Sequence, residues 1–316
     1  MATPFAIAVH GGVGTIDLQQ MSDVLKSQIK VDLERSVQAG YDCLQKGESA
    51  VEAVVAAVKV LEDSPHFNAG RGSVLNHQEM VEMEASIMDG RQCSSGTIAG
   101  VRHIRNPIAL AHDVMRQGSH LLLIGEGAEA FAFENGHIYT EQDYFYTEHR
   151  YLQLQRLKKQ AQTRPLESCL SKMDDREDHQ YGAVGAVALD KNGDLAAATS
   201  TGGVTNKQSG RVGSSALIGA GILAENGNVA ISTTSTNEWF GRHMVAADIA
   251  ARMRYLGEDV ATACEQVLHT ELNQANGGVI AINEKGHIHT TFNCAAMYRA
   301  SMHSDGSVEV EISINK

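Results

Sequence analysis

The segment HQYGAVGAVALD, residues 179–190, marks the point at which the character of the chain changes. A charged stretch ends before it, Gly182 interrupts the chain, and an apolar run typical of a buried strand starts at Ala183. The preceding residues, from about 151 to 180, include QRLKKQAQTRP and SKMDDREDHQ and predict an exposed linker. We therefore expect a junction between two halves of the chain at Gly182.

Both halves combine helices with short apolar strands. Residues 5–9, FAIAV, predict a buried strand, and ESAVEAVVAAVKVLED, residues 48–63, predicts a helix. After the junction, the turn KNGD separates two apolar runs and predicts a hairpin. Strands that do not alternate polar with apolar side chains need cover on both faces. This pattern predicts an α+β fold, a four-layer αββα sandwich, built as a single domain of residues 1–316.

The composition argues against several classes of protein. A net charge of −12 without a basic stripe argues against a nucleic-acid partner. No apolar run approaches the roughly 20 residues that a membrane-spanning helix requires. The first residues lack the features of a signal peptide. Five cysteines, scattered and without a CxxC pair, are typical of reduced thiols. We therefore expect a cytoplasmic protein with no membrane partner.

Ten short segments occur in an order that indicates a family. They are HGGVG, FNAGRGSVL, MEASIMDG, RNPIALA, VGAVALD, GDLAAATSTGG, TNK, GRVG, GAG, and FN followed by MYRA. Over essentially its whole length the chain resembles the plant-type asparaginase and isoaspartyl peptidase family of N-terminal-nucleophile hydrolases. The resemblance implies a precursor that cuts itself once, after Gly182, into an α-subunit (residues 1–182) and a β-subunit (residues 183–316). It also implies a homodimer of such pairs and no catalytic cofactor.

In this family the cut frees a threonine, whose hydroxyl attacks the substrate amide and whose α-amine accepts the proton. The substrates are L-asparagine and β-aspartyl dipeptides. The resemblance assigns Thr201 to a hydrogen bond near the nucleophile, Thr234 to the oxyanion hole, and Arg211 to the substrate α-carboxylate. Asn68 matches an asparagine close to the active centre. A loop whose backbone carbonyls hold a structural sodium ion in relatives matches Leu61, Glu62, Ser64, Phe67, Ala69 and Arg71.

Four departures from the family pattern fall in the pocket. The nucleophile position is Ala183, which has no hydroxyl for self-cleavage or for attack on a substrate. Where the family has an aspartate that holds the substrate ammonium group, this chain has Ser214. Two glycines of the family pattern are replaced by Ser235 and Asn237. A threonine and a glycine of the family pattern are missing from the tripeptide CAA, residues 294–296. We therefore expect an uncut chain that hydrolyses neither family substrate.

Three explanations remain open for this combination. The chain is a diverged member that binds a small carboxylate or amino-acid-like ligand, or a partner such as an active paralogue. Alternatively, the remodelled pocket carries new amide chemistry, or Ala183 is an engineered substitution in an active isoaspartyl peptidase or asparaginase. Other reactive side chains are interpreted as structural: Cys294 as a buried thiol, His10 as a loop histidine, and His287 and His289 as surface residues rather than a metal pair.

Overall fold

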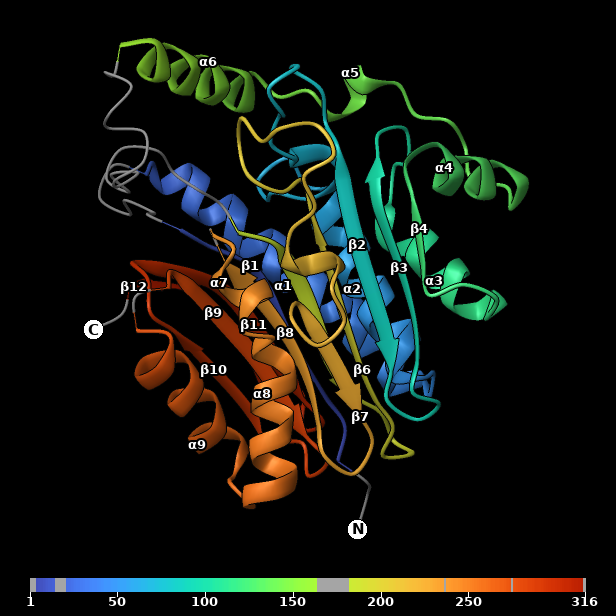
Figure 1. Ribbon diagram of the computed structural model, residues 1–316. Coiled ribbons are helices and arrows are strands. Elements are labelled where there is room, and N and C mark those ends of the chain that lie inside the picture. Colours follow the sequence, from blue (N-terminus) through green and yellow to red (C-terminus); the bar gives the residue numbers. More distant parts are fainter. Residues whose placement is uncertain (1–3, 15–20, 164–181, 236, 274, 315–316) are drawn as a thin grey trace.

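The computed structural model describes residues 4–14, 21–163, 182–235, 237–273 and 275–314, which form two sheets packed between layers of helices (Figure 1). The larger sheet has eight strands, in the order β12 (Val308–Ile314), β11 (Ala296–His303), β1 (Ala6–Gly14), β5 (Val184–Leu189), β6 (Leu195–Thr201), β2 (Met83–Asp89), β3 (Ser94–Val101) and β4 (Leu122–Ile124). The smaller sheet has four, in the order β10 (Ile288–Phe292), β9 (Gly277–Asn283), β8 (Val229–Ser235) and β7 (Ile222–Glu225).

Helices cover the outer face of each sheet. The larger sheet is covered by α1 (Asp23–Lys46), α2 (Ala50–Asp63) and α3 (Pro107–Gln117). The smaller sheet is covered by α8 (Val245–Ala251) and α9 (Val260–Glu265), which continue as the π-helical segments Arg252–Leu256 and Gln266–Glu271. The remaining helices are α4 (Gly125–Glu134), α5 (Gln142–Phe145), α6 (Glu148–Thr163) and α7 (Trp239–Arg242), with 3-10 turns at Gly70–Gly72 and Ser214–Ala216. The α+β class and the αββα sandwich predicted from the sequence are confirmed.

Strand β5 lacks alternation because apolar cores lie on both of its faces. Val184 and Ala186 pack into the core between the larger sheet and its helices. Val187 and Leu189 pack into the core between the two sheets. A third core lies between the smaller sheet and α8 and α9. Two covered faces explain why the segment after the junction is a continuous apolar run.

The predicted linker differs from the structure in its first part. Residues 148–163 form α6, and its side chains Arg150 and Leu154 are buried. Residues 164–180 of the predicted linker lie outside the described residues.

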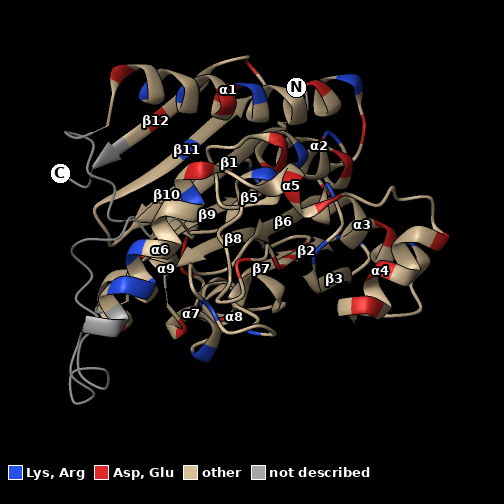
Figure 2. Cartoon of the chain, turned by 90° about the horizontal axis from the view of Figure 1, so that it is seen from above, with Lys and Arg blue, Asp and Glu red and all other residues tan. Residues whose placement is uncertain are grey.

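Two further surface properties follow from the helices. Within the described ranges no helix is long and apolar enough to cross a membrane. Charges of both signs are mixed on α1, whereas the charged residues of α4 are all acidic (Figure 2).

Candidate active site

The junction residue Ala183 directly precedes β5, in the middle of the larger sheet. Strand β5 pairs with β1 on one side and with β6 on the other. The amide of Gly182 donates a hydrogen bond to the carbonyl of Val13 (2.8 Å), which holds the junction against β1. Ala183 is 5% exposed, so its methyl group is almost fully enclosed. Central strands of the fold therefore fix the position of the junction.

The Thr234 hydroxyl lies directly against the backbone of Gly182. A Cβ atom added to Gly182 would come within 2.1 Å of Thr234 Oγ1, so only glycine fits there. On the other side, the carbonyl oxygen of Gly182 lies 2.6 Å from the Cβ position of Gly12, whose φ of +103° also favours glycine. Thr234 is 1% exposed, and its hydroxyl has no hydrogen-bond partner among the described residues. A buried donor therefore faces the junction.

Thr201 of β6 and Asn68 lie on the same side of the junction. Asn68 belongs to the segment FNAGRGSVL, which we call the glycine loop. Continued by one residue, the register of β5 and β6 places Thr201 opposite Ala183. The Thr201 hydroxyl accepts a hydrogen bond from the amide of Gly203 (3.0 Å). The Asn68 side chain donates to the carbonyl of Gly203 (2.7 Å). The structure thus places Thr201 and Thr234 beside the junction and Asn68 beside Gly203. The roles that the resemblance assigns to them stay predictions.

Arg211 lies at the rim of this region and already has a carboxylate partner. Its Nε and Nη2 atoms both donate to Oε1 of Glu238, at 2.9 and 2.7 Å. The Arg211 side chain is 21% exposed and that of Glu238 is 50% exposed. A pair this accessible is worth about 0.2–1 kcal/mol. A ligand carboxylate could therefore displace Glu238 from the guanidinium group at small cost.

Two buried charged residues near Arg211, Glu84 and Lys207, lie within the segments MEASIMDG and TNK, but no role was assigned to them from the sequence. Glu84 is fully buried and accepts hydrogen bonds from the amide of Gly213 through both carboxyl oxygens (3.0 Å each). Burial raises the pKa of Glu84, while Lys207 counteracts the shift. Burial lowers the pKa of Lys207, which the carboxyl groups of Glu84 and Glu82 oppose. The two segments contain Glu84 and Lys207 without indicating that the two side chains meet in the fold.

The three substituted pocket positions lie near Arg211. Ser214 begins the 3-10 turn that follows Gly213, and its side chain approaches Gly241 of α7. Ser235 ends β8 and donates from its hydroxyl to the carbonyl of Asn237 (3.1 Å). The Asn237 side chain in turn accepts from the amide of Trp239 at the start of α7 (3.1 Å). The side chains at positions 235 and 237 therefore hold their own loop together.

The loop predicted to bind sodium brings backbone carbonyls together around two glycines. The carbonyl oxygen of Glu62 lies 2.3 Å from the Cβ position of Gly70, and that of Phe67 lies 2.1 Å from the Cβ position of Gly72. Both carbonyl groups belong to the predicted set, and carbonyl oxygens are donors that hard cations prefer. The Glu62 carboxyl group is buried, which raises its pKa to about 8, and accepts from the hydroxyl of Ser200 (2.7 Å). Sodium binding by residues 61–71 stays a prediction.

The other reactive candidates have ordinary structural surroundings. Burial raises the pKa of the Cys294 thiol to about 11, so it is not a ready thiolate nucleophile. His10 is fully buried, and its Nε2 atom lies 2.7 Å from the Ser232 hydroxyl in the other sheet. Burial lowers the pKa of His10 to about 3, although the backbone of Ala183 counteracts part of this effect. His289 lies 3.0 Å from a Glu265 carboxyl oxygen, and within the described ranges no cluster of side chains suits a metal ion.

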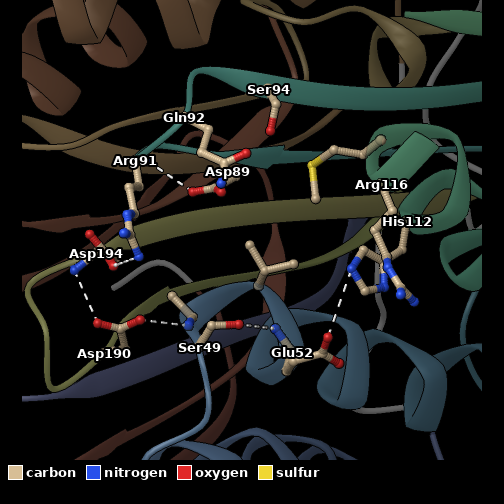
Figure 3. A pocket seen from close by; sticks show the side chains of 13 residues that line it. Ser49, Glu52, Asp89, Arg91, Gln92, Ser94, His112, Arg116, Asp190 and Asp194 are labelled. Carbon is tan, nitrogen blue, oxygen red and sulfur yellow. Dashed lines mark hydrogen bonds and ion pairs between the residues drawn. The ribbon is translucent and has the colours of Figure 1, made fainter. Parts of the chain in front are cut away.

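Figure 3 shows a charged cavity of about 380 Å³. It lies at the end of β5 that is opposite to the junction. The acidic side chains Asp190 and Asp194 in its lining already bind other groups of the chain. The Asp190 carboxylate accepts from the amide of Ala50 at the start of α2 (3.0 Å), and Arg91 lies 3.6 Å from Asp194. Because Asp190 and Ala183 stand at opposite ends of β5, this cavity is separate from the junction. We infer that these charged side chains stabilise the start of α2 and the turn between β5 and β6.

Known proteins resemble this chain along almost its whole length. The sequence model of the family described as asparaginase matches residues 3–312. An isoaspartyl peptidase of Escherichia coli is 46% identical over 296 residues, which cover 93% of this chain and 91% of that protein. A putative isoaspartyl peptidase/L-asparaginase of Dictyostelium discoideum is 38% identical, covering 96% and 94%. An isoaspartyl peptidase/L-asparaginase of Rattus norvegicus is 38% identical, covering 98% and 89%.

Proposed function

The chain belongs to the asparaginase family, and from this premise we propose that it is a member that stays uncut and binds a small carboxylate ligand without hydrolysing it. The observation that carries the proposal is the methyl group of Ala183, enclosed at the position from which the family's nucleophile attacks. Neither an acyl shift nor an attack on an amide can start from a methyl group. Loss of such a nucleophile lowers turnover by about 10⁶.

The test of this proposal is to supply the missing hydroxyl by Ala183→Thr. We expect the unchanged chain to remain at 34.0 kDa on a denaturing gel and to release no product from L-asparagine or β-aspartyl dipeptides. The Ala183→Thr variant is expected to cut itself, because Thr234 still faces Gly182, and yet to hydrolyse those substrates poorly. Ala183→Val, which matches threonine in shape but has no hydroxyl, should remain uncut. Full hydrolytic activity of Ala183→Thr would contradict the proposal.

The ligand is inferred from the charges that remain in the pocket. Arg211 offers a planar pair of donors, a geometry that matches a carboxylate. Ser214 offers a neutral hydroxyl where the family pattern has an aspartate for the ammonium group. Losing such a charge-assisted bond costs about 2–5 kcal/mol when the partner is buried. We therefore favour carboxylates without a neighbouring ammonium group over free amino acids.

This preference can be measured by thermal shift with succinate, malate, aspartate and asparagine as probes. We expect succinate or malate to raise the melting temperature more than the two amino acids do. Arg211→Ala should abolish that shift. Arg299→Ala is a matched control, because Arg299 is also paired with a glutamate and is 20% exposed. A shift that survives Arg211→Ala, or no shift with any probe, would exclude Arg211 as the binding group.

A second candidate is an active isoaspartyl peptidase or asparaginase in which Ala183 is a substitution. The positions of Thr201 and Thr234 beside the junction support it, as do Asn68 and Arg211, which the family pattern also has. It predicts that Ala183→Thr alone restores both self-cleavage and hydrolysis. The same variant therefore distinguishes the two candidates. New chemistry at Cys294 is less well supported, because its thiol is held in the protonated form.

A further inference from the structure

A buried carboxyl group lies in the same row of the larger sheet as the junction. Thr201 of β6 stands opposite Glu84 of β2 and, when the register is continued by one residue, opposite Ala183. Directly opposed residues of antiparallel strands have their side chains on the same face of the sheet. Met88, which is on the same face of β2 as Glu84, packs into the core between the two sheets. Glu84 therefore shares the inner face with Ala183 and Thr201.

Glu84 also holds the chain directly beside Arg211. Both of its carboxyl oxygens accept a hydrogen bond from the amide of Gly213 (3.0 Å each). A Cβ atom at Gly213 would lie 2.9 Å from Glu84 Oε1 and 2.9 Å from Arg211 Nη1, so the two charged groups are neighbours at this glycine. The other donors of the guanidinium group, Nε and Nη2, face Glu238. Arg211 thus lies between a buried carboxyl group and an exposed one.

Lys207 favours the charged form of Glu84. Its ammonium group is buried and donates to the backbone carbonyl two residues before Glu84 (2.6 Å). Burial raises the pKa of Glu84, and the positive charges of Lys207 and Arg211 oppose this rise. The Lys207 side chain also packs against Gly203, whose amide donates to the Thr201 hydroxyl. The two buried charges therefore support both the carboxylate end and the junction end of the pocket.

We propose that Glu84 is the positioning residue of the carboxylate site, because its charge and its hydrogen bonds to Gly213 hold the Arg211 guanidinium group in place. This role rests on the proposed function, in which Arg211 binds the ligand. An arginine that is held before binding loses less side-chain entropy when the ligand arrives. The exposed Glu238 leaves as the ligand carboxylate enters, whereas the buried Glu84 stays beside Nη1. The ligand is therefore bound through Nε and Nη2, the two donors that Glu238 releases.

The position of Arg211 can be measured without any ligand, by the rate at which phenylglyoxal labels each arginine in peptide mass mapping. Glu84→Gln keeps an acceptor for Gly213 but removes the charge. We expect this variant to label Arg211 several-fold faster than the unchanged chain does. Arg299 is the internal reference, because its side chain is 20% exposed against 21% for Arg211, and its rate should not change. Equal rates at Arg211 in the two proteins would overturn the proposal.

Two further variants separate positioning from a loss of stability. Asp190 is also fully buried and accepts from three backbone amides, but it lies at the other end of β5. Asp190→Asn should lower the stability in urea and leave the labelling of Arg211 unchanged. Adding Lys207→Met to Glu84→Gln removes both buried charges, and it should recover stability while Arg211 still reacts fast. Fast labelling in Asp190→Asn, or slow labelling in the double variant, would reduce Glu84 to a structural role and overturn the proposal.

Calorimetry with succinate gives a second readout of the same role. We expect Glu84→Gln to weaken binding by about fivefold, because the released Arg211 side chain then loses its entropy on binding. Asp190→Asn should bind succinate as the unchanged chain does. Equal affinity of the unchanged chain and Glu84→Gln would contradict the proposal. If succinate does not bind the unchanged chain, the proposed function fails, whereas the labelling rates still decide whether Glu84 positions Arg211.

Discussion

At the level of individual residues, Glu238 is the acidic partner of Arg211 in the proposed carboxylate site. It occupies both outward donors of Arg211 that a ligand would need. We expect Glu238→Gln to tighten carboxylate binding by up to about fivefold, since an exposed ion pair is worth at most about 1 kcal/mol. Titration calorimetry with the best carboxylate probe measures this change. Glu311→Gln, which removes the matched partner of Arg299, should leave the dissociation constant unchanged. Weaker binding in Glu238→Gln would instead show that Glu238 positions Arg211 for its ligand.

His10 links the two sheets and should make stability depend on pH. Its pKa is lowered from 6.5 to about 3 in the folded chain. The unfolded chain therefore binds more protons between these values, and the stability contribution is complete above pH 6.5 and is lost as the pH falls. The slope for one proton is about 1.4 kcal/mol per pH unit.

We expect His10→Asn to show a shallower loss of stability between pH 6.5 and pH 4 than the unchanged chain. Urea unfolding at several pH values gives the two slopes. His287→Asn, at an exposed histidine, should behave like the unchanged chain. Equal slopes for His10→Asn and the unchanged chain would mean that His10 does not carry this dependence.

The sequence motifs pointed to candidate residues around the junction. They did not predict the buried charged pair of Glu84 and Lys207. Thr201, Thr234, Asn68 and Arg211 were found because short motifs surround each of them. Glu84 and Lys207 also lie in such segments, but their proximity was not predicted, because it joins strand and loop residues that are far apart in the chain. Likewise, no motif indicates that the Glu238 carboxylate would pair with the Arg211 guanidinium group.

Among the elements, α6 shows where composition misleads. Its sequence is polar because much of the helix surface faces water, and only a few positions are buried, including Arg150 and Leu154. The Arg150 Nε atom donates to the carbonyl of Gly72 (2.8 Å), which fastens α6 to the glycine loop beside the site. Arg150, directly before the predicted linker, thus anchors a helix whose polar sequence predicted an exposed linker.

Removal of this anchor should destabilise the fold. We expect Arg150→Ala to lower the free energy of unfolding by about 2–3 kcal/mol, because a buried hydrogen bond from a charged group is lost and Gly72 loses a donor. Arg156→Ala, at an exposed position of the same helix, should change it by less than about 0.5 kcal/mol. Urea unfolding measures both. Equal effects of the two substitutions would show that α6 is not anchored through Arg150.

At the scale of the whole molecule, the two halves of the chain are interleaved in one sheet. Strands β1 to β4 come from residues before the junction, and β5, β6, β11 and β12 from residues after it. The layered architecture was predictable, because apolar strands without alternation require two covered faces. The strand order was not, because pairing between β1 and β11 joins residues almost 300 positions apart.

Interleaving predicts that the two halves fold only together. We expect separately encoded residues 1–182 and 183–316, expressed in the same cell, to copurify when only one carries an affinity tag. Each half alone should lack a cooperative unfolding transition, because its strands would expose unpaired edges. A half that folds cooperatively by itself would contradict this expectation.

The crowding at Gly182 has a consequence for substitutions at the junction. A side chain at position 182 would collide with Thr234 unless that residue moved, whereas position 183 encloses a methyl group. A single substitution that removes a hydroxyl at position 183 would therefore leave the neighbouring strands, loops and donors in place.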